Sequence, residues 1–501
     1  MALGETRNGI MRTKSVEQSI ADTDEPDSKL RKDLTTWDLI VFGVAVVVGA
    51  GIFTLAASTA GDVAGPSVSL AFVLAAVACA LAALCYAEFA STLPVAGSAY
   101  TFSYATFGEF IAWIIGWDLV LEFAVAAAVV AKGWSQYLAT VFSQFGADVP
   151  TTLDLGPFGV DWGALLLIAV LTVLLVLGTK LSSRVSLVIT TIKVAIVLFV
   201  IILGFGYINA DNYTPFIPPA AAADADSGGG LQQSLLSAIG GEAGSTYGIY
   251  GLLAAASLVF FAFIGFDVVA TTAEETRNPQ RSLPRGILGS LAIVTVLYVA
   301  VAFVLTGMVH YTELQTQPDG TRATLATAFS SLGVDWAATV IAVGALAGLT
   351  TVVMVMLLGQ IRVFFAMSRD GLLPRSFART GSRGTPVRAT VLIGVVVAIT
   401  ATFFPADVLE EMVNIGTLFA FVLVSIGVVI LRRTRPDLPR AFRTPLVPLV
   451  PILAVLACVW LMINLSVETW LRFVVWMAVG VVVYFAYGRS HSVLGKRERA
   501  Q

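Results

Sequence analysis

Ionisable residues lie inside long apolar stretches of this 501-residue chain, where few neighbours could bind a proton or an ion. Lys193 lies about nine residues into the apolar stretch 185–208, roughly 13 Å from its end at the rise of a helix. Ionisable groups at such depth in a membrane are costly and mark candidate functional sites. Burial disfavours a charged amine, so Lys193 is a candidate for taking up and releasing a proton, although a lysine can also reach toward the membrane surface.

Acidic residues occur in other apolar stretches. Asp118 and Glu122 are four residues apart, which places them on one face of a helix. Glu122 is a candidate for lining a pocket, whereas Asp118 could pair with Lys132 or with a polar neighbour. Asp267 is a candidate functional residue because of its depth, or it could cap a helix. Glu88 lies near the end of the apolar stretch 66–93. At that position we expect either a contact that closes the transport path, as a gate, or a carboxylate exposed to water.

Two apolar stretches carry glycine halfway along, in Val46–Phe53 and in Phe260–Asp267. Glycine weakens a helix interior, and an opened helix at mid-membrane exposes amides at one end and carbonyls at the other. Such a pair of breaks suits a zwitterion, because amides bind a carboxylate and carbonyls bind an ammonium. The alternative is that these glycines only allow close helix packing. The predicted binding residues are Val47, Gly49, Ala50, Gly51 and Ile52 in the first break and Phe261, Ala262, Ile264 and Asp267 in the second.

The composition predicts an integral membrane protein. Apolar residues make up 57% of the chain and charged residues 13%, and the mean hydropathy is +0.86. A soluble protein carries nearly twice that share of charge. The net charge of −3 gives no field for nucleic acid, and the sequence has no phosphate-binding glycine loop. With two histidines and three scattered cysteines, we expect no enzyme, no cofactor and no metal site.

Twelve stretches are long and apolar enough to predict membrane-spanning helices. They are 36–60, 66–93, 107–139, 162–181, 185–208, 247–276, 283–309, 332–361, 387–404, 407–431, 447–465 and 470–488. Of the 30 lysines and arginines, 26 fall in the tails and loops of one side. Positive residues favour the cytoplasmic side, so both termini are predicted to be cytoplasmic.

Several motifs together resemble the amino acid permeases of the amino acid–polyamine–organocation superfamily, in the cationic amino acid transporter branch. They occur in family order between residues 49 and 374. The motifs are Gly49-Ala50-Gly51-Ile52-Phe53, Cys85-Tyr86-Ala87-Glu88-Phe89-Ala90-Ser91, Pro94-Val95-Ala96-Gly97-Ser98-Ala99-Tyr100, Gly116-Trp117-Asp118-Leu119-Val120-Leu121-Glu122, Phe260 to Asp267, Glu274-Glu275-Thr276-Arg277-Asn278-Pro279 and Ala366-Met367-Ser368-Arg369-Asp370-Gly371-Leu372-Leu373-Pro374.

The resemblance implies a fold and roles for particular residues. The fold is all-α and leucine-transporter-like, with two inverted repeats of five spans and two further helices. Lys193 corresponds to the lysine that proton-coupled relatives carry between spans 1, 5 and 8, where other members hold sodium. Glu122 corresponds to an acid directed at the substrate side chain, and Asp267 corresponds to an acid that relatives use at the substrate site or in proton coupling. Met356 corresponds to a position that is smaller in relatives accepting arginine, which favours small neutral or hydrophobic amino acids.

The predicted organisation follows from the spans and the resemblance. The segments are a polar cytoplasmic segment 1–35, a first repeat 36–208, an extracellular connector 209–246, a second repeat 247–431, peripheral spans 432–488 and a cytoplasmic tail 489–501. We expect a proton-coupled amino acid symporter of the plasma membrane that works by alternating access. Transport of arginine, lysine or a polyamine, exchange, and amino acid sensing without transport remain alternatives, and the oligomeric state is left open.

Overall fold

A computed structural model describes residues 12–13, 33–93, 95, 98–147, 149–155, 158–178, 183–222, 231–240, 245–317, 321–381 and 385–500. Most of the predicted polar segment 1–35 and parts of the predicted connector 209–246 lie outside the described residues. The same holds for Pro94, Ala96 and Gly97 of one quoted motif.

The described chain is almost entirely helical, with two short antiparallel strand pairs. The first part of the chain contains α2 (Thr36–Val47), η1 (Gly51–Leu55), α3 (Ala56–Thr59), η2 (Ala60–Ala64), η3 (Gly65–Ser67), α4 (Val68–Thr92), α5 (Ser98–Thr106), α6 (Glu109–Gln144), β1 (Thr152–Leu155), β2 (Phe158–Asp161), α7 (Trp162–Val176), α8 (Ser183–Phe205), η4 (Ala210–Tyr213), β3 (Ala221–Ala222), α9 (Leu235–Gly240) and β4 (Ser245–Thr246). The second part contains α10 (Gly248–Val259), η5 (Phe260–Phe263), η6 (Asp267–Glu275), α11 (Pro279–Met308), η7 (Tyr311–Leu314), α12 (Leu325–Ser331), α13 (Asp335–Arg369), η8 (Arg375–Ala378), α14 (Val387–Phe403), α15 (Ala406–Thr434), α16 (Leu449–Ile463), α17 (Val467–Val483), η9 (Tyr484–Gly488), α18 (Arg489–His491) and α19 (Val493–Ala500).

Helices occupy every apolar stretch that the sequence predicts to span a membrane. Within the described residues, eight helical segments are long and apolar enough to cross a bilayer, and four more apolar helices are shorter. The shorter four are Thr36–Val47, Trp162–Val176, Val387–Phe403 and Leu449–Ile463. The all-helical membrane architecture is therefore confirmed, and the count of twelve spans stays a prediction.

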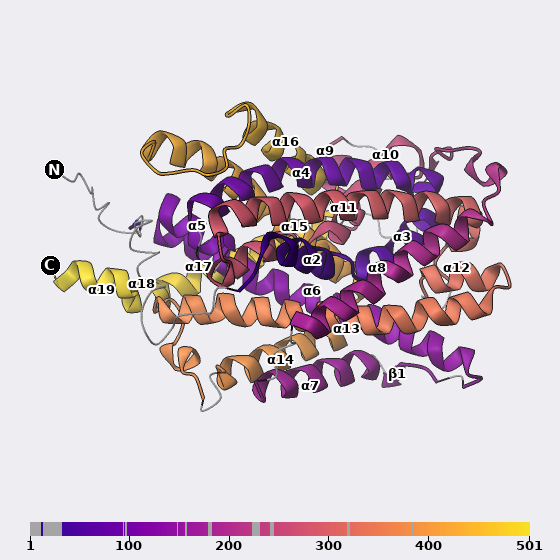
Figure 1. The fold of residues 1–501 in the computed structure, drawn as a ribbon, viewed down its shortest axis with the longest axis horizontal. Coiled ribbons are helices and arrows are strands. Elements are labelled where there is room, and N and C mark those ends of the chain that lie inside the picture. The colour runs from indigo at the N-terminus through magenta and orange to yellow at the C-terminus, as the bar shows by residue number, and fades with distance from the viewer. Residues whose placement is uncertain are drawn as a thin grey trace.

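The long helices run along the long axis of the molecule, with α5, α18 and α19 at one end and α12 and β1 at the other (Figure 1). Helices at corresponding places in the two halves pack against each other. The pairs in contact are α4 with α11, α6 with α13, α7 with α14 and η1 with η5. The predicted inverted repeat would produce such pairing, but contacts alone do not give the relative orientation of the two halves, so the inverted repeat stays a prediction. The repeat boundaries at 208 and 247 stay predictions.

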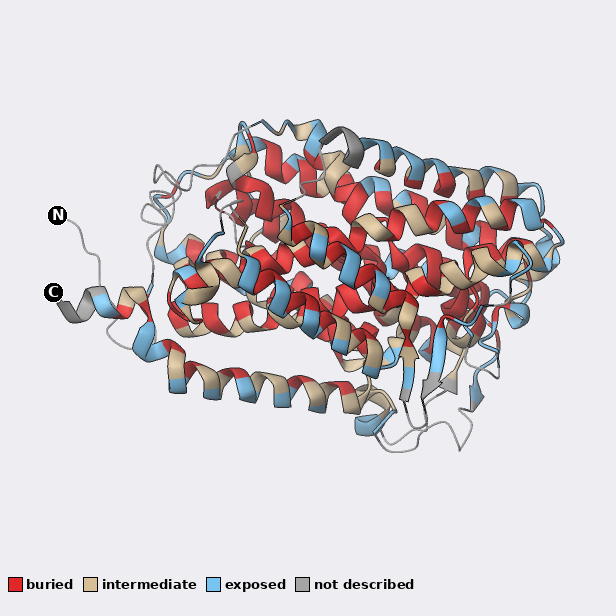
Figure 2. Cartoon of the chain, turned by 90° about the horizontal axis from the view of Figure 1, so that it is seen from below, coloured by how far each residue is buried: buried red, intermediate tan, exposed pale blue. Residues whose placement is uncertain are grey.

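The outer surface of the helical body carries large apolar side chains, as a lipid-facing surface requires. Val173 on α7, Ile399 on α14 and Leu456 on α16 are each more than half exposed. Buried residues concentrate in the inner helices, and exposed residues follow the outward faces of the outer ones (Figure 2).

The buried Glu109, at the start of α6, binds residues near both ends of the chain. Glu109 is fully buried and accepts hydrogen bonds from Tyr104, Tyr484 and Ser492. Its backbone N–H donates to the carbonyl of Arg12 at 2.8 Å. The described residues near both termini thus meet at one end of the helical body.

Candidate functional site

The first predicted break is present where the glycines predict it. Helix α2 ends at Val47, and Val48 takes an extended conformation with φ −69° and ψ 93°. The chain then resumes as a π-helical turn from Gly51, and Ala50 before it makes no side-chain capping bond. The backbone groups around residues 48–50 therefore need partners from elsewhere in the molecule, because lipid offers none.

Lys193 supplies partners for the carbonyls at this break. Its ammonium donates to the carbonyl of Ala45 at 2.6 Å and to that of Val48 at 3.3 Å. The side chain is fully buried on α8, and its stem packs against Gly348 of α13. Lys193 therefore lies between spans 1, 5 and 8, as the resemblance implies, and it does not reach toward the membrane surface.

The second break interrupts the span that begins with α10. Residues Phe260–Phe263 form a 3-10 turn, Ile264 is extended, and Gly265 has φ +118°. This positive φ is a conformation that glycine adopts readily and other residues resist. A second 3-10 segment starts at Asp267, whose side chain is 1% exposed and whose Oδ1 has no hydrogen-bond partner among the described residues.

The two breaks lie against each other through their small residues. A Cβ added to Gly51 would overlap the backbone of Ala262, and one added to Gly265 would lie 2.7 Å from Cγ1 of Val46. Gly49 faces α13 in the same way, with Val352 in contact. The glycines therefore do two jobs, since they permit the breaks and also allow the broken segments to approach.

All residues predicted to bind substrate are buried around these breaks or on the helices that adjoin them. Val47 is the last residue of α2, and Met356 lies on α13 one turn beyond Val352, hence on the same face. The buried set comprises Val47, Gly49, Ala50, Gly51, Ile52, Glu122, Phe261, Ala262, Ile264, Asp267 and Met356. Their contact with a substrate stays a prediction.

Glu122 on α6 links two other buried carboxyl groups. It is close enough to Asp267 of the second break and to Asp118 on its own helix to repel each of them when charged. Both oxygens of Glu122 and of Asp118 lack a hydrogen-bond partner among the described residues. The suggested pairing of Asp118 with Lys132 is wrong. Fourteen residues separate the two positions along α6, about 21 Å at the rise of a helix, and Lys132 interacts with Asp161 instead.

Among the described residues, the side-chain partners of Glu88 all lie outside the two breaks. Its carboxylate forms a bidentate pair with Arg432, at 2.8 and 2.7 Å, and accepts the Thr444 N–H at 2.8 Å. Nε of Arg440 also lies 3.3 Å from it. Glu88 thus joins the end of α4 to the end of α15 and to the following loop. Its role as a gate stays a prediction.

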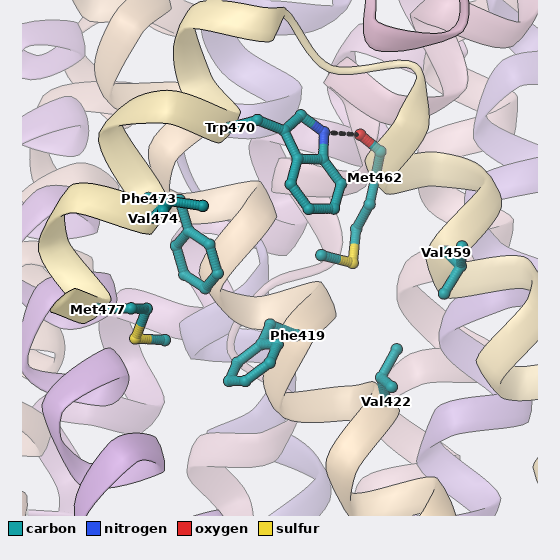
Figure 3. A pocket seen from close by; sticks show the side chains of 8 residues that line it. All are labelled: Phe419, Val422, Val459, Met462, Trp470, Phe473, Val474 and Met477. Carbon is teal, nitrogen blue, oxygen red and sulfur yellow. Dashed lines mark hydrogen bonds between the residues drawn. The ribbon is translucent and has the colours of Figure 1, made fainter. Parts of the chain in front are cut away.

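An apolar cavity of about 320 Å³ lies between α15, α16 and α17, away from the breaks (Figure 3). The indole N–H of Trp470 points at the carbonyl of Met462 and is satisfied there at 2.9 Å. The lining residues are Phe419, Val422, Val459, Met462, Trp470, Phe473, Val474 and Met477. These side chains offer no group for an ammonium or a carboxylate, so this cavity does not suit a zwitterion.

Two tyrosines hold the first break, and neither was among the predicted site residues. The Tyr298 hydroxyl on α11 donates to the carbonyl of Val47 at 2.6 Å, and that of Tyr137 on α6 donates to the carbonyl of Phe53 at 2.6 Å. A tyrosine inside an apolar stretch needs a partner for its hydroxyl, which is the signal that could have found them. The sequence alone does not tell which backbone carbonyl is that partner.

Comparison with known proteins gives consistent similarities over nearly the whole chain. The family model described as amino acid permease matches residues 34–486. A methylthioribose transporter from Bacillus subtilis is 41% identical over 98% of this chain and all of its own length. A branched-chain amino acid permease, BcaP, from the same organism is also 41% identical, over 98% of this chain and all of its own length. A vacuolar cationic amino acid transporter 4 from Arabidopsis thaliana is 37% identical over 86% of this chain and 68% of its own length.

Proposed function

This chain belongs to the amino acid permease family, and from that premise we propose that it takes up a small neutral or hydrophobic amino acid together with a proton. Uptake proceeds by alternating access across the plasma membrane, with both termini in the cytoplasm. The excess of lysine and arginine on one side supports this orientation. The multi-pass helical architecture and the two helix breaks support a carrier.

The contact of Lys193 with the first break carries the proposal of proton coupling. A protonated amine donates charge-assisted hydrogen bonds to the carbonyls of Ala45 and Val48, whereas a neutral amine binds them weakly. Loss of the proton therefore loosens the break from α8. The geometry of the first break is in this way linked to the protonation of one buried side chain.

The two breaks would bind different ends of a zwitterion. Lys193 already occupies carbonyls before the first break, so the substrate ammonium is left with carbonyls near the second. The half-helix after the first break begins at Gly51, and Ala50 before it supplies no side-chain cap, so the amides of its first turn suit the substrate carboxylate. We therefore place the substrate backbone between residues 49–52 and 261–264.

The choice of substrate rests on Met356 and on the relatives. A buried thioether in α13 fills volume that a long cationic side chain needs. One similar protein is named as a branched-chain amino acid permease, which fits this choice. The equally similar methylthioribose transporter makes a thioether sugar the second candidate. That solute has no ammonium or carboxylate for the helix breaks to bind.

Uptake into proteoliposomes tests the proposal. Purified protein is reconstituted, a pH gradient is imposed, and uptake of labelled alanine and leucine is followed with arginine and methylthioribose as competitors. We expect uptake that rises with the inward proton gradient and competition by neutral amino acids. Counterflow without dependence on the gradient would indicate an exchanger, and binding without counterflow a sensor. Competition by methylthioribose alone would refute the amino acid assignment.

A further inference from the structure

Asp118 is a buried acid for which the transport cycle described above gives no task. It lies on α6, is fully buried, and neither carboxyl oxygen has a hydrogen-bond partner among the described residues. Its carboxyl group packs on α15 at Gly416, where an added Cβ would lie 2.8 Å from Oδ1. Glycine at this position leaves room for the acid against the α15 backbone.

The groups around Asp118 and Glu122 are acidic or neutral. Glu122 follows on the same helix face, Asp267 comes from the second break, and Thr417 from α15 lies beside Glu122. Tyr86 of α4 interacts with all three acids and is fully buried, with Ser98 of α5 beside its hydroxyl. Helices α5, α7, α13, α14 and α17 also pack on α6, and within the described part of the chain no basic group from them interacts with these acids.

A carboxylate in this setting is far less stable than a carboxylic acid. An ionised group in a low-dielectric interior needs hydrogen-bond donors or a counter-charge, and Asp118 has neither among the described residues. Negative charge on Glu122 would oppose its ionisation further. The close contact between α6 and α15 also keeps water from the carboxyl group while it persists.

We propose that Asp118 is a proton-binding site of this carrier, separate from Lys193, which carries its proton in this conformation and releases it when α6 and α15 separate. On release, the O–H bond of the acid breaks, the proton passes to water, and the negative charge stays on Asp118. The hydroxyl of Tyr86, which interacts with Asp118, is a donor that can stabilise that charge. The inference rests on the proposed proton-coupled function and adds a second proton to it.

Infrared spectroscopy of the full-length protein in lipid tests the site directly. The carboxylic acid C=O stretch is recorded across a pH titration for the wild type, Asp118→Asn and Glu410→Gln. Glu410 is the matched control, because it is a buried acid held by Arg322 at 2.8 and 3.1 Å. We expect a protonated-acid band that titrates in the wild type and in Glu410→Gln and is missing in Asp118→Asn. Proton flux per substrate should fall in Asp118→Asn while uptake persists.

Gly416→Ala keeps the test decisive if Asp118→Asn does not fold. Its Cβ displaces the carboxyl group without removing it, so the band should shift. An unshifted band in Gly416→Ala, or an unchanged band in Asp118→Asn, overturns the inference. A band that is unchanged at every pH also overturns the inference, because an acid that never releases its proton has only a structural role. A titrating Asp118 band in a protein whose uptake ignores the pH gradient refutes the proposed function and leaves the proton site in place.

Discussion

The two helix breaks solve the same physical problem in different ways. At the first, side chains from other helices satisfy the exposed carbonyls, with Lys193 on Ala45 and Val48 and Tyr298 on Val47. At the second, the acid that follows the break keeps one oxygen without a partner among the described residues. Unpaired polar groups at this depth persist only where they have a use.

The difference indicates that the two breaks bind different partners. The first binds a side chain of the protein itself, and the second leaves polar groups for a bound substrate. The first break carries its own cation, Lys193, which the proposed mechanism makes the proton-dependent switch. The second break has small residues pressed against the first and an acid cluster beside it. We expect changes at the first break to alter coupling and changes near the second to alter what is bound.

Removing the internal cation should give the largest effect. Lys193→Met keeps the stem that packs on Gly348 and removes the bonds to both carbonyls. Hydrogen bonds to charged groups contribute about 1.5–3 kcal/mol each, so gradient-driven uptake should fall by roughly a hundredfold. The measurement is initial uptake into proteoliposomes at several pH gradients. Lys132→Met, a partly buried lysine on α6, is the matched control, and an equal loss there would contradict a special role for Lys193.

Forcing the two breaks apart should come next. Gly51→Ala places a methyl group onto the backbone of Ala262, which cannot give way as a flexible side chain can. Overpacking of this kind costs about 1–3 kcal/mol, so uptake should fall roughly tenfold with the protein still folded. Gly240→Ala is the control, because nothing lies within 4 Å of its added Cβ. Full uptake by Gly51→Ala would show that the observed contact between the breaks is not needed.

Loss of a neutral bond at the first break should have a smaller effect. Tyr298→Phe removes the hydroxyl 2.6 Å from the carbonyl of Val47. A buried carbonyl left without its donor costs about 1–3 kcal/mol. We expect part of this cost to lower the stability of the fold and part to slow transport. We expect a lower thermal unfolding temperature and uptake reduced about fivefold. Tyr250→Phe, at an exposed position, is the control, and indistinguishable unfolding of the two variants would contradict the assigned bond.

The breaks were predictable because their signal is local. Glycine at mid-helix identifies both interruptions, and the motifs around Gly49 and Gly265 identified the family that the comparisons confirm. Burial of Lys193 against the first break followed from the resemblance. Periodicity and composition could not supply that position, because it depends on how α8 packs against α2.

The partners of side chains were not predictable where they depend on tertiary packing. Tyr298 lies about 250 residues from the carbonyl it binds, and Arg432 lies far along the chain from Glu88. A pairing of Asp118 with Lys132 looked reasonable from charge alone and fails on helix geometry. Sequence identifies which groups need a partner, and only packing identifies the partner.

The smallest expected effect concerns Met356, the residue predicted to limit the size of the substrate side chain. Met356 is buried on α13 on the same face as Val352, which contacts Gly49. Replacing it with serine removes a flexible thioether and opens volume, so inhibition of alanine uptake by arginine should strengthen about threefold, a modest change for one enlarged contact. Met354→Ser, also buried on α13 and two residues away on a different face, is the matched control. If both variants respond alike, Met356 does not set the selectivity, and Glu122 and Asp267 near the second break become the residues to vary.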